Sequence, residues 1–260
     1  SCPDSGRRKA MSYTLVTFLL DKSGSMTHGL DDTIGAFNIY LDGLRKSDDI
    51  QFTLLQFDSF DIEKTAVNMT PRDVPNLDRK TFIPRGGTPL IDAAYKTIRA
   101  VERQVEAATE KPKVVICIQT DGQENESREH KWEELSDLIK EKTAAGWEFV
   151  FMGASIDAYE QGSRMGISRA STVSYDSRDR AATESAFAFT ASNAVNFAAG
   201  RSASAGYTTH QKKMSGDKFD AWVNQTPPAT AGEAPQTAGA SPAPAKPAKP
   251  KPIVEDFDLG

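Results

Sequence analysis

At 260 residues the chain is long enough for one sizeable α/β domain with a tail, or for two small domains, and we expect one domain with extensions. The formal net charge of -5 and the pI near 5.4 argue against a protein that wraps nucleic acid or lies on an anionic membrane surface, since both need a basic footprint. No apolar run approaches the roughly 18 residues of a membrane span, and no basic region leads into an apolar stretch at the N-terminus. We therefore expect a soluble, cytoplasmic protein.

Strand and helix patterns alternate along the chain after a polar leader, residues 1–11, to which we assign no fold. Apolar, β-branched runs predict strands, and apolar residues at offsets of three and four predict helices. Thr88 is expected to be the N-cap of one helix, with Pro89 at its first position. In chain order we predict a strand at 14–20, a helix at 31–45, strands at 50–57 and 64–69, a helix at 89–105, a strand at 114–119, a helix at 132–144, a strand at 148–152, a helix at 154–165, a strand at 171–175 and a helix at 180–199.

This alternation predicts an α/β fold with a doubly wound, Rossmann-like, mostly parallel sheet of about six strands and helices on both faces. The domain is expected to span residues 12–225, with its core at about 12–199 and an extension at 200–225. Residues 226–252 are almost wholly Pro, Ala, Gly, Thr and Lys, a composition that predicts a disordered, extended linker.

The last segment, residues 253–260, interleaves apolar side chains with acids. We weigh two interpretations about equally: a short motif that docks on a second protein, and an end without a role. A bolder variant places one of its carboxylates on a metal ion of the same or a neighbouring chain.

Carboxylates and hydroxyls follow the predicted strands where a parallel sheet binds its ligands, beyond the carboxyl ends. Asp21, Ser23 and Ser25 follow the first strand, Thr88 lies in Gly-Gly-Thr-Pro, and Asp121 follows the strand at 114–119. Magnesium prefers oxygen ligands, keeps several waters and is commonly held by one or two carboxylates. No His or Cys lies nearby, which disfavours zinc and copper. The sequence predicts a magnesium site, at which Mn²⁺ or Ca²⁺ is also possible.

At these residues the sequence resembles the von Willebrand factor A (VWA) domain family, whose metal-ion-dependent adhesion site (MIDAS) is written Asp-x-Ser-x-Ser, then Thr, then Asp. The match covers roughly residues 12–199. The resemblance implies that Ser23, Ser25 and Thr88 ligate the metal directly, and that Asp21 and Asp121 act largely through water. A Glu or Asp of a partner would fill the sixth position.

Simpler interpretations stand beside these assignments. Asp21 could cap a turn, Ser25 a helix start, and Asp121 could serve only the turn before Gly122. Thr88 could be a cap as well as a ligand. We expect Glu124, Glu126 and Glu129 to form a solvated acidic rim. The Lys22 side chain is expected to be exposed beside the site, and Asp58 is expected near the same edge of the sheet.

The function expected from these residues is a non-enzymatic, metal-dependent protein-binding module, because no acid, base or nucleophile set accompanies the site. The alternative is a metal-dependent phosphohydrolase that uses the same cation, although Ser at position 23 departs from the Asp-x-Asp pattern of aspartyl phosphatases. The resemblance also implies a role in an intracellular multi-protein assembly, with an AAA+ ATPase or a stress-system component as partner.

Overall fold

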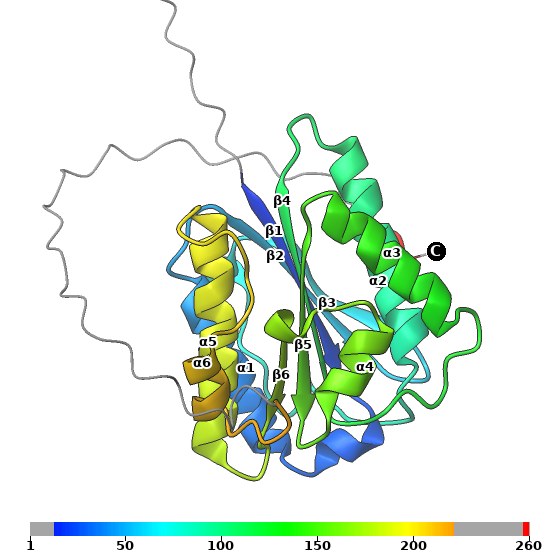
Figure 1. The fold of residues 1–260 in the computed structure, drawn as a ribbon, viewed down its shortest axis with the longest axis vertical. Coiled ribbons are helices and arrows are strands. Elements are labelled where there is room, and N and C mark those ends of the chain that lie inside the picture. The colour runs from blue at the N-terminus through cyan, green and yellow to red at the C-terminus, as the bar shows by residue number, and fades with distance from the viewer. Residues whose placement is uncertain (1–12, 221–256, 260) are drawn as a thin grey trace, which may run out of the picture.

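A six-stranded sheet forms the centre of the computed structural model, which describes residues 13–220 and 257–259 (Figure 1). The strand order is β3-β2-β1-β4-β5-β6, and every neighbouring pair is parallel except β2–β3. The sheet confirms the predicted doubly wound, mostly parallel α/β fold. Its strands are β1 (Thr14–Asp21), β2 (Ile50–Phe57), β3 (Ile62–Met69), β4 (Lys113–Thr120), β5 (Glu148–Ala154) and β6 (Thr172–Tyr175).

Helices cover both faces of the sheet, as Figure 1 shows. One face carries α1 (Leu30–Leu44) and α5 (Arg180–Ala198), and α6 (Thr209–Met214) packs beside α5. The other face carries α2 (Leu90–Ala107), α3 (Trp132–Ala144) and α4 (Ala158–Arg164). Short 3₁₀ turns lie at Gly24–Thr27, Pro71–Asp73 and Arg169–Ser171.

The central strand β1 is apolar on both sides because each side meets a helical layer. Phe18 points into the α1 and α5 layer, where its ring centroid lies 5.5 Å from that of Phe37, 4.8 Å from Tyr40 and 5.9 Å from Phe187. Leu19 packs in the opposite layer. This packing on both faces fixes where β1 ends and therefore where the loop after it begins.

One predicted boundary is wrong. The helix expected at 154–165 begins only at Ala158, because β5 continues through Gly153 and Ala154 and Asp157 then caps the helix by accepting a hydrogen bond from the Tyr159 amide (3.0 Å). Gly153 permits this turn: a Cβ at that position would lie 2.6 Å from the Ala158 Cβ. The close approach of the backbone, which no sequence period reveals, moves the helix start.

Residues 200–220 pack against the sheet and its helices. Tyr207 is buried in the α1 and α5 layer, and its hydroxyl lies 2.7 Å from Thr190 Oγ1. A buried ion pair joins Lys212 to Asp220, and the Tyr159 hydroxyl donates to Asp220 Oδ2 (3.2 Å). These buried polar contacts tie the segment after α5 to α4.

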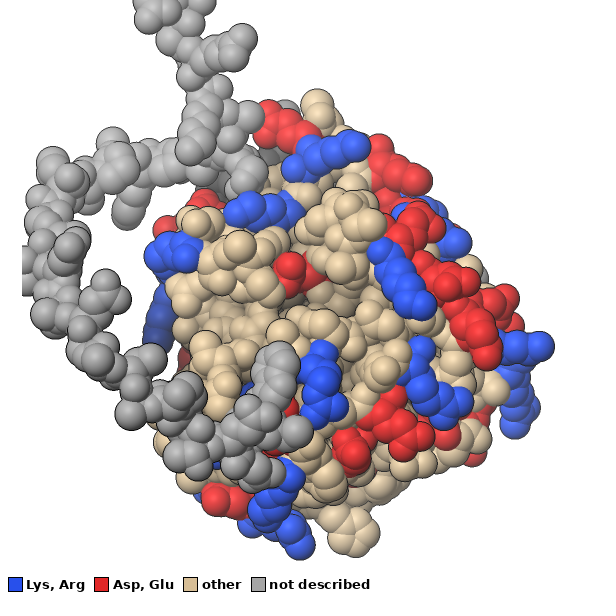
Figure 2. Space-filling view, in the orientation of Figure 1, with Lys and Arg blue, Asp and Glu red and all other residues tan. Residues whose placement is uncertain are grey.

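The predicted leader, the predicted linker at 226–252 and most of the 253–260 segment lie outside the described residues. Phe257, Asp258 and Leu259 are described, and they lie against the layer that contains α2 and α3. In the described part of the chain, no helix is both long and apolar enough to cross a membrane. Figure 2 shows basic and acidic side chains interspersed over the viewed face, without a large patch of one sign.

Candidate metal centre

The candidate site lies where the strand order reverses, between β1 and β4. The chain leaves β1 toward α1 on one face and leaves β4 toward α3 on the other, and such a divergence opens a crevice beyond the carboxyl ends of the two strands. The parallel register pairs Leu20 with Gln119. Asp21 at the end of β1 consequently lies beside Thr120 at the end of β4.

Asp21 is fully buried, and both of its carboxylate oxygens accept hydrogen bonds. Oδ1 accepts from the Ser23 amide (2.7 Å) and Oδ2 accepts from the Thr120 hydroxyl (2.6 Å). Burial raises the pKa of Asp21 to about 6, although the hydrogen bonds from Thr120 and Ser23 act in the opposite direction. A cation beside this carboxylate would relieve the cost of burying its charge.

The hydroxyls of the first loop connect Asp21 to the third loop. Ser23 Oγ lies 3.0 Å from Ser25 Oγ, and Ser25 Oγ donates to Asp121 Oδ1 (2.6 Å). Burial raises the pKa of Asp121, an effect that the hydrogen bond from Ser25 and the charge of His28 partly offset. Ser23 is buried and Ser25 is exposed, so the row of oxygens leads from the sheet to the surface.

Thr88 joins this group through contacts of the second loop with its two neighbours. The Gly24 amide donates to the Gly86 carbonyl (2.9 Å), and the Thr88 amide donates to Asn125 Oδ1 (2.9 Å). A Cβ at Gly122 would lie 3.6 Å from Thr88 Oγ1 and 3.9 Å from Ser25 Oγ. The structure therefore brings together all five residues that the sequence singles out: Asp21, Ser23, Ser25, Thr88 and Asp121.

The prediction that Thr88 caps α2 is wrong. The helix begins at Leu90, and Pro89 occupies the N-cap position. The side chain of Pro89 makes no capping hydrogen bond. The third loop covers the helix start instead: Glu124 Oε2 accepts from the Ile91 amide (2.8 Å), and Ser127 Oγ accepts from the Asp92 amide. Thr88 is buried, and it contacts Asn125 of the third loop through its backbone amide rather than through its hydroxyl.

The acidic rim predicted for the third loop is only partly present. Glu126 and Glu129 are exposed, and Glu129 pairs with Lys96 (2.8 Å). Glu124 is half-buried and accepts hydrogen bonds from the amides of Glu126 and Ser127 and from the Ser127 hydroxyl, in addition to that from α2. Glu124 thus organises the loop that carries Asp121.

Lys22 is buried rather than exposed, because a charge network lies directly behind the site. Its ammonium lies 2.7 Å from Glu63 and 3.7 Å from Asp58, and the buried Asp58 accepts from Arg85 Nε (2.7 Å). Burial alone would raise the pKa of Asp58, but hydrogen bonds, chiefly from Arg85, hold it below its usual value. Asp58 therefore lies near the predicted edge, where it braces the loops after β1 and β2.

The donors at the site fit a hard cation. They are two carboxylates and three hydroxyls, and magnesium or manganese with several retained waters suits such a set. Among the described residues, no three His, Cys, Asp or Glu side chains gather in a way that could hold a metal, which speaks against a site rich in carboxylates or imidazoles. The sequence analysis missed Thr120, Glu124 and Asn125 as supports of these donors, since their roles depend on contacts between different loops.

Comparisons with solved structures find the same fold in other proteins. The PilB minor pilin from Streptococcus sanguinis superposes with a TM-score of 0.55 at 13% identity, covering 76% of this chain and 64% of that one. A von Willebrand factor type A protein from Catenulispora acidiphila gives 0.52 at 12% identity, covering 71% and 43%. Proximal thread matrix protein 1 from the mussel byssus, with a zinc-occupied MIDAS motif, gives 0.50 at 12% identity, covering 70% and 48%.

These likenesses show a VWA-like α/β fold. The chain matches less than two thirds of the length of each of these proteins. A scan against protein-family models finds no match, and a search of curated proteins finds none either.

Proposed function

We propose that the chain is a divalent-metal-dependent protein-binding module that captures a partner carboxylate at a MIDAS-type site. The observation that carries the proposal is the continuous row of oxygens from buried Asp21 through Ser23 and Ser25 to Asp121, with the Thr88 hydroxyl beside it. Ser23, Ser25 and Thr88 would hold the metal, and Asp21 and Asp121 would support it.

The composition of this site explains why it would bind reversibly. Two carboxylates and three hydroxyls neutralise a divalent cation less than a ring of carboxylates does, so the cation retains affinity for one more anionic oxygen. A Glu or Asp side chain of another protein supplies such an oxygen and replaces only a water. The zinc-occupied MIDAS of the mussel protein supports a metal at the corresponding place in this fold.

The surface around the second loop also suits a protein partner. Phe60 is 71% exposed, and a Cβ at Gly86 would lie 3.0 Å from its ring. The guanidinium of Arg85 lies over the same ring, 5.1 Å from its centroid. An exposed aromatic ring with a cation beside it is a common anchor at protein interfaces.

The geometry argues against the phosphohydrolase alternative. A nucleophilic Asp must present a free oxygen, whereas Asp21 is fully buried and both of its oxygens accept hydrogen bonds. Ser25 donates to the carboxylate of Asp121, and among the described residues it makes no hydrogen bond to a His or Lys that could act as its base. We therefore propose that the module binds its partner and does not catalyse a reaction on it.

Calorimetric titration with Mg²⁺ and Mn²⁺ tests the proposal on the wild type, on Asp21→Asn with Asp121→Asn, and on Asp137→Asn as a control. Asp137 is exposed on α3, so its variant removes one carboxylate that is not among the proposed donors. We expect binding to the wild type and the control, and none to the double variant. Absence of metal binding to the wild type would refute the proposal.

A lysate pull-down with Mg²⁺ or with chelator then tests partner capture, with Ser23→Ala as the variant and Asp137→Asn as the control. Proteins retained only with metal, and lost in Ser23→Ala, would be the partners. Their identification by mass spectrometry tests whether an AAA+ ATPase or a stress-system component is among them. If the same proteins are retained with chelator and by Ser23→Ala, a contact bridged by the metal is contradicted.

A further inference from the structure

The last described residues of the chain, Phe257–Leu259, pack against the domain, and we call them the tip. In Figure 1 the tip lies beside α2, in red. Phe257 is 2% exposed, as buried as the core residues, although only three residues of the sequence follow it. Arg103 on α2 donates a hydrogen bond from Nη2 to the Asp258 carbonyl. Leu259 is half-buried.

The tip occupies an apolar groove between α2 and the edge strand β3. Ile62 and Val67 of β3 are only partly buried by the domain, and they border the same apolar layer as Phe257 and Leu259. Leu259 shares a pocket of about 410 Å³ with Ile62 and with Ala93 of α2. The tip completes a layer that the helices leave unfinished at this edge of the sheet.

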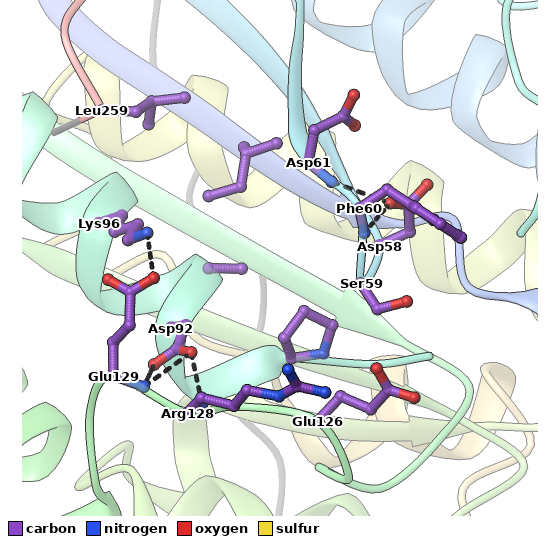
Figure 3. A pocket seen from close by; sticks show the side chains of 13 residues that line it. Asp58, Ser59, Phe60, Asp61, Asp92, Lys96, Glu126, Arg128, Glu129 and Leu259 are labelled. Carbon is purple, nitrogen blue, oxygen red and sulfur yellow. Dashed lines mark hydrogen bonds and ion pairs between the residues drawn. The ribbon is translucent and has the colours of Figure 1, made fainter. Parts of the chain in front are cut away.

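The pocket extends beyond the position of Leu259. Figure 3 shows Leu259 at one end of the pocket and Ser59 and Glu126 toward the other. Lys96 and Arg128 lie along the pocket among five carboxylates, and Lys96 pairs with Glu129 (2.8 Å). An aromatic anchor and a backbone carbonyl held by an Arg are features by which a groove binds a peptide segment.

About 36 residues, 221–256, join the last described residue of the domain to the tip. A tether of this length gives a local concentration on the order of millimolar. For a segment whose own Kd is on the order of 100 µM, this local concentration fills the groove and weakens a free competitor about tenfold. Occupation by the chain's own tip is thus favoured over binding of free peptide at ordinary concentrations.

We propose that the groove between α2 and β3 is a recognition site for short segments of the pattern Phe-x-Leu, and that the tip Phe257–Leu259 of the same chain occupies it as a tethered ligand. None of the residues that hold the tip is one of the proposed metal donors. A partner segment of the same chemistry binds there only by displacing the tip.

The test uses a peptide of residues 253–260 with a fluorophore at its N-terminus, followed by anisotropy in the presence of EDTA so that the metal centre plays no part. Its targets are the wild type and full-length Phe257→Ala. We expect Phe257→Ala to bind the peptide at least tenfold more tightly than the wild type does. A peptide with Phe257→Ala should bind at least tenfold more weakly to the same target, since a fully buried Phe contributes a factor on the order of ten to a hundred.

Two further proteins make the test decisive. A chain that ends at residue 252 should bind the peptide as Phe257→Ala does, and Arg103→Ala combined with Phe257→Ala should bind more weakly than Phe257→Ala alone. Circular dichroism melts establish that each variant is folded. No binding to any folded variant up to millimolar peptide would overturn the proposal, as would equal binding to wild type and Phe257→Ala. Concentration-dependent dimers that Phe257→Ala abolishes would place the tip in a neighbour's groove and overturn the assignment within one chain.

Discussion

Thr120→Val is the substitution that most directly probes how the fold prepares the candidate site. Thr120 is not one of the proposed ligands, yet its hydroxyl donates to Asp21 Oδ2 at 2.6 Å and accepts from the Gly122 amide at 3.1 Å. Valine has nearly the same shape and suits a strand end, so the change removes these hydrogen bonds and little packing. Thr120 would thereby be shown to position the carboxylate rather than to bind the metal.

The size of the effect follows from the type of hydrogen bond. A hydrogen bond to a charged group contributes about 1.5–3 kcal/mol, and 1.4 kcal/mol corresponds to about a factor of ten. Residues that orient metal ligands typically affect affinity by about tenfold to a hundredfold. We therefore expect Thr120→Val to weaken Mg²⁺ and Mn²⁺ binding by about tenfold or more at pH 7, and to raise the pKa of Asp21 further.

The assay is calorimetric metal titration, with Thr14→Val as the matched control. Thr14 lies at the other end of β1, and its buried hydroxyl makes no hydrogen bond within the described part of the chain. The control should keep the wild-type metal affinity and be at least as stable as the wild type, since it removes an unpaired buried polar group. If Thr120→Val binds metal within twofold of the wild type, the support that we assign to this hydroxyl is refuted.

Three further predictions follow from buried groups. Because the pKa of Asp21 is raised to about 6, metal affinity should fall about tenfold per pH unit below pH 6, and the metal-free protein should lose about 3 kcal/mol of stability as the pH rises from 4 through 6. Asp58→Asn should lower the free energy of unfolding by about 3 kcal/mol in urea titrations, because it removes the buried carboxylate that accepts from Arg85 and lies beside the buried Lys22. Phe187→Ala should cost about 3–5 kcal/mol in the same assay, since its buried ring packs against Phe18 and Tyr175.

Each of these predictions has an outcome that would contradict it. A metal affinity that stays constant from pH 7 to pH 5 would mean that Asp21 does not exchange a proton for the metal. Asp31→Asn, which breaks the exposed pair with Arg79, is the control for Asp58→Asn and should leave stability unchanged within error. Equal stability of both Asn variants would show that the Lys22 network contributes nothing. A loss below about 1 kcal/mol in Phe187→Ala would imply that the core closes over the missing ring.

Local patterns were sufficient to predict the sheet and most of its helices. The strand after Tyr13 and the buried strand at 114–119 are continuous apolar runs, which identify a parallel sheet covered on both faces. The rule that ligands bind beyond the carboxyl ends of such strands then brought Asp21 and Asp121 to one edge, where the structure places them. The boundary at Ala158 was missed, because a close backbone approach at Gly153 decides it.

The errors around the site share one cause. Thr88 resembles an N-cap when only its own neighbours are considered, but Glu124 and Ser127 of a distant loop satisfy the helix start. Lys22 resembles a solvated side chain, but Asp58 and Glu63 on other elements surround it. A sequence pattern reports local preference, whereas the partner of a polar group depends on which loops the sheet order brings together.

The sequence by itself determined the type and order of the donors and the strands that they follow, because hydrophobic periodicity and turn chemistry act over a few residues. Only the tertiary structure decided which donors meet, that Thr120 supports Asp21, and that Phe257 returns to the groove beside α2. These contacts join residues about a hundred or more positions apart, and their formation depends on strand register and on the packing of two helical layers. No local preference along the chain contains that information.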